Sequence, residues 1–188
     1  MSSERHFIVI EGIDGSGKTT IGRKLANRLG AVFYQTPSGV WRKYRNIVEG
    51  KPPIIRCIYY LFATIASSFE ISAMLRYNSV VCDRYIYSTW AYHLGYGCNC
   101  LKVVPFYRLP ITKPNKTYYL QVDNSERERR IRFRNNNTYR DMDSVSLDSI
   151  NNIFMSMGNL VCVDTTGLCE DDVVELLITQ VKSNNNQY

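Results

Sequence analysis

The chain has 188 residues, 45% of them hydrophobic and 12% aromatic, so it is long and apolar enough for a packed core and is not a disordered chain. Its formal net charge of +6 fits an anionic partner, either a nucleic acid or a small anionic substrate. No apolar run approaches the roughly 20 residues that span a bilayer, and the apolar run near the amino terminus is too short for a signal peptide. We therefore expect a cytoplasmic protein with no membrane partner, folded as one domain over residues 1–188, with a frayed polar tail at 183–188.

Short apolar runs alternate with helical patterns along the chain. In chain order the sequence predicts a strand at 7–11, a helix at 18–29, a strand at 31–34, a helix at 53–76, a strand at 79–83, a helix at 86–93, a loop at 95–101, a strand at 117–122, a helix from 124 to 134, a helix at 141–157, a strand at 160–164 and a helix at 171–181. Continuous apolar strands that alternate with helices are typical of a parallel sheet covered on both faces. We therefore expect an α/β fold with a five-stranded parallel sheet and helices on both faces.

Residues 12–19, Gly-Ile-Asp-Gly-Ser-Gly-Lys-Thr, match the pattern G-x-x-x-x-G-K-[ST] between a predicted strand and a predicted helix. Small residues let the backbone wrap a phosphate, and the helix N-terminus adds partial positive charge. This motif, the P-loop, predicts a nucleoside triphosphate site in a P-loop NTPase fold. The predicted ATP-binding residues are Gly12, Asp14, Gly15, Ser16, Gly17, Lys18, Thr19 and Thr20.

Asp83 ends an apolar strand, where a carboxylate faces the crevice in which α/β proteins bind ligands. With the Thr19 hydroxyl it is predicted to hold Mg²⁺. The alternative is an ordinary strand-terminal acid that caps the following helix.

Five arginines lie at 127, 129, 130, 132 and 134, interleaved with Glu126 and Glu128. Phosphoryl transfer needs cations around the transferred group, so this segment predicts an arginine-bearing lid over about 124–141. A solvated helix or a nucleic-acid patch would show the same composition, although the interleaved acids weigh against nucleic acid.

Several motifs together resemble the thymidylate kinase family. The P-loop and its flanks, Glu11 to Thr20, show the Glu-Gly-x-Asp opening of that family, and Asp83-Arg84-Tyr85 resembles its Asp-Arg-Tyr/His motif. Residues 86–92 match a Ser-x-x-Ala-Tyr pattern, and 61–63 match the Leu-Phe-Ala start of a helix that supplies a base-stacking Phe. The strand and lid at 120–134 and the loop at 164–167 follow in the family's order.

The resemblance implies that ATP, with Mg²⁺, phosphorylates a nucleoside monophosphate to its diphosphate, with dTMP as the usual acceptor. It implies that Lys18 holds the donor phosphates, Arg84 grips the acceptor phosphate and Phe62 stacks on the base. The acceptor-binding residues would be Asp14, Pro37, Phe62, Arg84, Ser88 and Tyr92. Gly15 stands where one branch of the family has an Arg, so lid arginines would act instead. The catalytic residues would then be Lys18, Arg84, Arg130, Arg134 and Asp14, with Arg132 as a third lid candidate.

Two departures leave the acceptor open. The turn at Gln35-Thr36 lacks the family's Arg, so a cation for the acceptor phosphate would come from Arg42, Lys43 or Arg45. Ala66 stands where the family has an Arg that reads the thymine edge, and the loss of such a partner weakens discrimination. Another nucleotide acceptor, a nucleoside kinase, a nucleotide-binding protein with weak catalysis and a nucleic-acid binder remain as alternatives.

Family members are commonly dimers that pack helices face to face, so we expect a homodimer. The apolar stretch 54–65 fits such a face but fits a buried core equally, and Phe62 within it fits either a core or a base platform.

Overall fold

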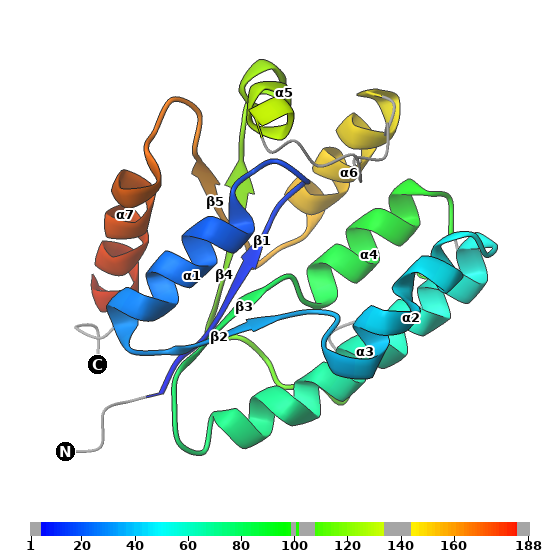
Figure 1. Cartoon of the computed structure of the whole chain (residues 1–188), viewed down its shortest axis with the longest axis horizontal. Helices are drawn as coiled ribbons and strands as arrows, with labels where there is room; N and C mark the ends of the chain where they lie inside the picture. Colours follow the sequence, from blue (N-terminus) through cyan, green and yellow to red (C-terminus); the bar gives the residue numbers. More distant parts are fainter. Residues whose placement is uncertain (1–4, 99–100, 102–107, 134–143, 184–188) are drawn as a thin grey trace.

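A computed structural model describes residues 5–98, 101, 108–133 and 144–183. Its centre is a five-stranded, wholly parallel sheet in the order β2-β3-β1-β4-β5 (Figure 1). The strands are β1 (Phe7–Glu11), β2 (Val32–Gln35), β3 (Val80–Asp83), β4 (Lys116–Gln121) and β5 (Val161–Asp164). The predicted parallel sheet is confirmed, and no strand end differs from its predicted position by more than one residue.

Helices cover both faces of the sheet. They are α1 (Lys18–Leu29), α2 (Gly39–Glu49), α3 (Pro53–Met74), α4 (Ile86–Gly95), α5 (Asn124–Phe133), α6 (Ser144–Ser156) and α7 (Glu170–Ser183). Successive side chains of a strand point to opposite faces, so Ile8 and Ile10 of β1 pack with α1 and α7, while Phe7 and Val9 pack with α3, α4 and α6. The five residues of β1 are all buried, which explains why its sequence is apolar throughout.

Helix α2 is the element that the sequence prediction missed. Pro37 and Gly39 indicated the end of a strand, and no helix was expected between that strand and residue 53. The helix has apolar residues at Val40, Tyr44 and Ile47, one face of a helix, yet all three are exposed. A helix that buries none of its residues in the core gives a weaker pattern than the helices on the sheet, although this spacing could have revealed it.

Helix α3 has 22 residues and is the one helix among the described residues that is long and apolar enough to cross a membrane by length and composition. This corrects the expectation from sequence that no such segment exists. A third of its most apolar stretch is buried in the protein, and core helices of soluble proteins pass the same test. Two polar residues on α3, Thr64 and Ser68, make hydrogen bonds to Thr89 and Thr112 elsewhere in the domain.

Candidate active site

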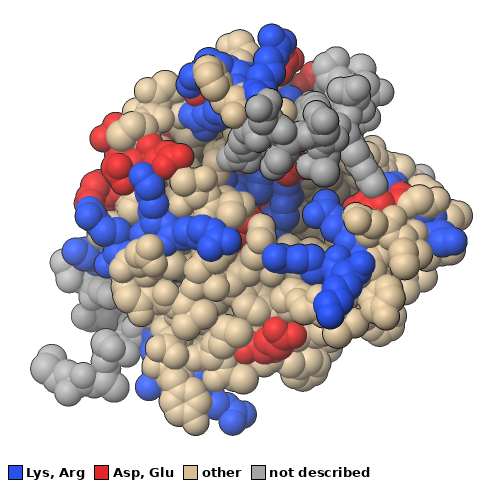
Figure 2. Space-filling view, in the orientation of Figure 1, with Lys and Arg blue, Asp and Glu red and all other residues tan. Residues whose placement is uncertain are grey.

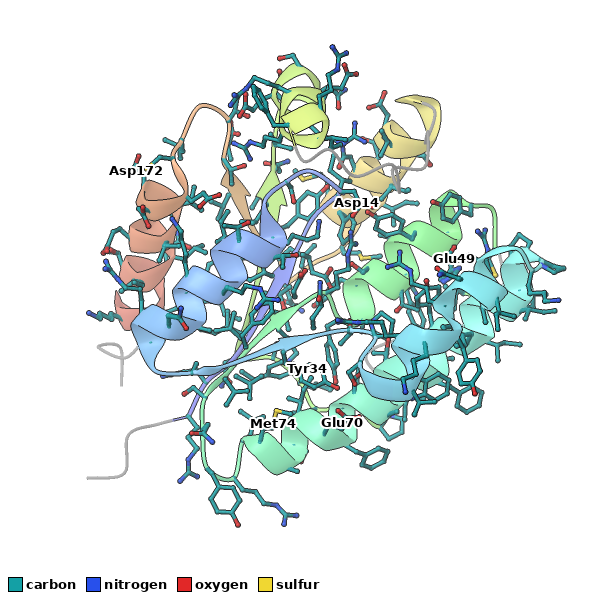
Figure 3. The ribbon with its side chains drawn as sticks, viewed as in Figure 1. Asp14, Tyr34, Glu49, Glu70, Met74 and Asp172 are labelled. Carbon is teal, nitrogen blue, oxygen red and sulfur yellow. The ribbon has the colours of Figure 1, made fainter. Side chains whose placement is uncertain are left out.

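A cavity of about 590 Å³ lies at the carboxyl edge of the sheet. Strands β1 and β3 are neighbours and Ile10 pairs with Asp83, so the loops that follow both strands open on this edge. The P-loop, the ends of β2 and β3, and one side each of α2, α3 and α4 line the cavity. Asp14 from the P-loop and Glu49 from the end of α2, both labelled in Figure 3, belong to this lining. Figure 2 shows basic side chains gathered at the hollow in the middle of this face.

The P-loop places its backbone and Lys18 against the cavity. Gly15 and Gly17 adopt φ values of 93° and 90°, which L residues rarely adopt. A Cβ on Gly15 would lie 2.8 Å from Cγ of Arg127, so only glycine lets α5 approach the loop this closely. The Lys18 ammonium donates to the carbonyl of Ile13 at 2.5 Å. Burial and the nearby Arg84 lower the pKa of Lys18 to about 8.

Not all of the predicted ATP-binding residues lie at the cavity surface. Those that line it are Asp14, Gly15, Gly17, Lys18 and Thr19. Gly12 and Ser16 are buried behind them, where a Cβ on Gly12 would clash with the Ser16 hydroxyl, and Thr20 lies in the first turn of α1. Within the motif, the buried residues therefore stabilise the loop conformation, and the residues at the cavity surface are accessible to a ligand.

Asp83 and Thr19 lie side by side. The Thr19 hydroxyl donates to Oδ2 of Asp83 at 2.5 Å, and the side-chain amide of Gln35 donates to the same oxygen at 2.9 Å. The other carboxylate oxygen, Oδ1, is buried and has no hydrogen-bond partner among the described residues.

The open question of whether Asp83 caps the next helix is answered by Glu11. Its fully buried carboxylate accepts hydrogen bonds from the backbone N–H groups of Tyr85 and Ser88 at the start of α4. Burial raises the pKa of Glu11, although its hydrogen bonds and Arg84 oppose that rise. Asp83 therefore remains available to the cavity, and Glu11 joins the end of β1 to α4.

Arg84 is at the centre of a polar cluster in the cavity. Its φ of 66° is in the left-handed region, which residues other than glycine rarely adopt. Its guanidinium forms an ion pair with Asp14, donates to the Ser88 hydroxyl at 3.1 Å and lies 5.1 Å from the centre of the Tyr92 ring. The Arg84 charge holds the pKa of the Asp14 carboxyl well below its usual range. The structure thus brings together four of the six predicted acceptor-binding residues.

The described part of the predicted lid is α5, which packs on the P-loop. Arg127 is buried and donates to the carbonyl of Asp14 at 2.8 Å. Arg130 donates to Glu126 at 2.8 Å and to the carbonyl of Thr165 at 2.9 Å, with its Nη1 atom beside Gly17. Arg132 is exposed and paired with Glu128, and Arg134 lies outside the described residues. Among the described lid arginines, Arg127 and Arg130 lie at the P-loop, and Arg130 is the one of these two that was predicted to be catalytic.

A model of the thymidylate kinase family matches residues 10–175 of the chain. The chain belongs to the thymidylate kinase family. It is 32% identical to a probable thymidylate kinase of Methanocaldococcus jannaschii over 94% of this chain and 96% of that protein. It is 34% identical to a probable thymidylate kinase of Methanococcus vannielii over 68% of this chain and 66% of that protein.

Solved structures of related enzymes share the fold. A thymidylate kinase from Candida albicans superimposes with a TM-score of 0.80 at 20% identity, over 100% of this chain and 96% of the other. A deoxyadenosine kinase from M. mycoides superimposes with a TM-score of 0.69 at 16% identity, over 94% and 98%. The family assignment makes the chain an enzyme of the nucleoside monophosphate kinase class, and the predicted P-loop fold is confirmed.

Phe62 does not lie where the resemblance to thymidylate kinases implies. It is 57% exposed and is not among the residues that line the cavity. The cavity face of α3 carries Arg56, Tyr60, Ala63 and Thr64, with spacings of four, three and one that define one side of a helix. Phe62 is on another side of α3 and does not line this cavity, whereas Tyr60 is the aromatic residue of α3 that does.

Some of the remaining residues predicted for the acceptor side line the cavity and others do not. Pro37 lines the cavity after a cis Thr36–Pro37 bond. Of the three substitute cations, Arg45 lines the cavity, Arg42 is held by Gln35 and the Pro37 carbonyl, and Lys43 is exposed. Sequence reasoning missed the roles of Arg56, Tyr60 and His93 in the cavity wall, because they belong to no contiguous motif.

Proposed function

We propose that this chain transfers the γ-phosphoryl group of ATP to the phosphate of dTMP, giving ADP and dTDP. One observation carries the proposal: the cations that would hold donor and acceptor phosphates line the same cavity and flank one carboxylate. Lys18 lies 3.9 Å from Asp14, and Arg84 forms an ion pair with the same Asp14 oxygen. Two phosphate groups bound to these cations would be neighbours, as direct transfer requires.

The reaction requires the protein to position the two phosphates and to stabilise their negative charge, and it requires no covalent intermediate with the protein. The acceptor phosphate is already ionised at neutral pH, so no general base is needed. Lys18 and the P-loop N–H groups would stabilise the donor phosphates, and Arg84 would orient the attacking phosphate oxygen. Arg130, already beside Gly17, would approach the transferred group when α5 closes over the cavity and excludes water.

The Asp83–Thr19 pair fits a Mg²⁺ ion. Oxygen ligands suit this ion, and the buried Oδ1 of Asp83, unpaired within the described part of the chain, is a carboxylate oxygen without a protein donor. Thr19 and Asp83 would therefore hold Mg²⁺ directly or through water. When bound, the ion neutralises charge on the donor phosphates.

The proposal includes a homodimer that packs the outer sides of α2 and α3. Large apolar residues are exposed on both helices, and their surface is defined by Val40, Tyr44, Ile47, Ile54, Ile55, Ile58, Phe62 and Phe69. The helices lie side by side (Figure 1), and exposed apolar patches of this kind mark contact surfaces. Phe62 would then serve the dimer rather than the base. Analytical ultracentrifugation should show a dimer that Phe62→Glu converts to a monomer, while Tyr77→Glu, at an exposed aromatic outside α3, leaves it intact.

A cytoplasmic location with no nucleic-acid or membrane partner also belongs to the proposal. Helix α3 supplies Arg56, Tyr60 and Thr64 to the cavity wall, so it serves as a wall of the catalytic domain. Arg129 and Arg130 are paired with Glu126, and Arg132 is paired with Glu128, which reduces the charge that α5 could offer to nucleic acid.

The test is a panel of nucleotides with ATP and Mg²⁺, read by chromatography: dTMP, dUMP, dCMP, dGMP, dAMP and thymidine. We expect dTDP as the main product and no reaction of thymidine. Preferred phosphorylation of thymidine would support a nucleoside kinase instead. Binding of ATP without any diphosphate product would support a nucleotide-binding protein, and a preference for another monophosphate would overturn dTMP while keeping the kinase.

A further inference from the structure

The last residue of β2 places its amide side chain between two charged groups. The side-chain nitrogen of Gln35 donates to Oδ2 of Asp83 at 2.9 Å, and its side-chain oxygen accepts from Nη2 of Arg42 at 2.9 Å. Arg42 also donates from Nε to the carbonyl of Pro37 at 3.2 Å. Side chains from β3, from β2 and from the start of α2 therefore form one continuous polar chain.

The chemistry of the two partners determines the orientation of the amide. An ionised carboxylate only accepts hydrogen bonds, and a guanidinium only donates them. One orientation of the Gln35 amide satisfies both, with its nitrogen toward Asp83 and its oxygen toward Arg42. Because Arg42 is itself held by the Pro37 carbonyl, the amide has a fixed partner at each end.

The pairing of the two strands does not need this side-chain bond. Gln35 and Asp83 are direct partners in the parallel ladder between β2 and β3, and the backbone N–H of Thr36 donates to the Asp83 carbonyl at 3.1 Å. The backbone therefore already joins the strands at this point. The side chains of direct partners lie on the same face of a sheet, and both of these line the cavity. The amide thus acts on the Asp83 carboxylate rather than on the sheet.

Two donors from different elements hold this carboxylate. Its Oδ2 atom accepts from the Thr19 hydroxyl of α1 and from the Gln35 amide of β2, which together restrict its rotation. Groups that hydrogen-bond to a metal-ligating carboxylate orient it and so raise its affinity for the ion. A neutral amide does this without adding a positive charge that would repel a bound cation.

We propose that Gln35 is a positioning residue that orients Asp83 for Mg²⁺, and that Arg42 holds Gln35 in this orientation. The inference rests on the proposed function, because it concerns the metal site of the same reaction. It gives the departure from the family at Gln35 a role of its own. It also gives Arg42 a role other than that of a cation for the acceptor phosphate, which agrees with its position outside the cavity lining.

The experiment measures how much Mg²⁺ strengthens the binding of a non-hydrolysable ATP analogue to the full-length protein. Calorimetry gives the dissociation constant with EDTA and with Mg²⁺, and the ratio of the two reports the contribution of the metal site. Gln35→Met should lower this ratio by about 10- to 100-fold. The affinity in EDTA should stay unchanged, because the P-loop still binds the phosphates, and this value also shows that the variant is folded.

The Arg42 variants test the far end of the polar chain. Arg42→Met should lower the ratio by about 2- to 10-fold, the effect of one lost hydrogen bond, and Arg42→Lys, which keeps a donor, should restore most of it. The matched control is Lys43→Met, which removes the neighbouring exposed cation of α2 and should leave the ratio unchanged.

Four outcomes would overturn the inference. They are a ratio within about 2-fold of wild type in Gln35→Met, an equal loss of affinity with Mg²⁺ and with EDTA, and a wild-type ratio near one. The fourth is a higher KM for dTMP in Arg42→Met with an unchanged ratio, which would make Arg42 a cation for the acceptor phosphate. Phosphorylation of dTMP by the wild type tests the proposed function separately from all four.

Discussion

The P-loop side of the cavity and the side formed by α2, α3 and α4, called here the helical side, are built in different ways. On the P-loop side, one continuous loop supplies the backbone and the lysine, and Lys18, Thr19 and Arg84 all have partners within the chain. On the helical side, Glu49, Arg56 and His93 come from three helices, and two of these residues have a buried nitrogen without a hydrogen-bond partner among the described residues. The P-loop side is therefore determined by one contiguous segment, whereas the shape and polarity of the helical side depend on how distant helices pack.

The largest effect expected on the P-loop side comes from Lys18→Ala. Loss of the ammonium that contacts the donor phosphates should lower kcat by about 10³-fold or more for every acceptor, with the thermal midpoint little changed. Steady-state kinetics and calorimetry measure both. Wild-type turnover in this variant would show that the loop does not hold the donor.

Arg84→Met should lower kcat/KM by about 10²-fold for all monophosphates alike, because the guanidinium meets the phosphate that they share. Equal losses for dTMP and dCMP would show that Arg84 acts on the phosphate and not on the base. A loss confined to one base would contradict the division of the cavity into two sides.

Gly15→Ala tests how closely α5 approaches the loop. The new methyl group would meet Arg127 at 2.8 Å from a backbone with φ of 93°, so the free energy of unfolding should fall by about 1–3 kcal/mol. Chemical denaturation measures it. Gly50→Ala, where the added carbon meets nothing within 4 Å and φ is negative, serves as the matched control and should change stability little.

An effect of similar size on stability is expected from the titration of His93 on the helical side. His93 has a pKa of about 4 in the folded protein and an ordinary value near 6.5 when unfolded, so the unfolded chain binds more protons between these values. Stability should therefore fall as pH drops from about 6.5 to 4, by about 1–3 kcal/mol more in the wild type than in His93→Asn. Urea unfolding at several pH values compares the slopes, and identical slopes would show that His93 does not titrate in this way.

Features that depend on contiguous stretches of sequence could be predicted from the sequence. The buried strands, the P-loop and the Asp83-Arg84 turn with Ser88 and Tyr92 all follow from short motifs, and the structure gathers them as expected. Helix α2 was missed because its apolar side meets no core. The position of Phe62 outside the cavity lining could not be predicted, because a sequence motif does not fix the rotation of a helix. Arg56 and His93 are 37 positions apart, and only the packing of α3 against α4 brings them to one cavity.

The ion pair between Asp14 and Arg84 has a consequence for the empty enzyme. The Asp14 carboxylate is already paired with the Arg84 guanidinium. An anion that binds Arg84 must therefore compete with a carboxylate of the same chain, whose effective concentration is high. Weak or singly charged anions, such as chloride or acetate, lose that competition. A dianionic phosphate ester that also makes contacts through its base can displace Asp14 from Arg84. The site therefore favours nucleotides over simple anions before any lid has moved.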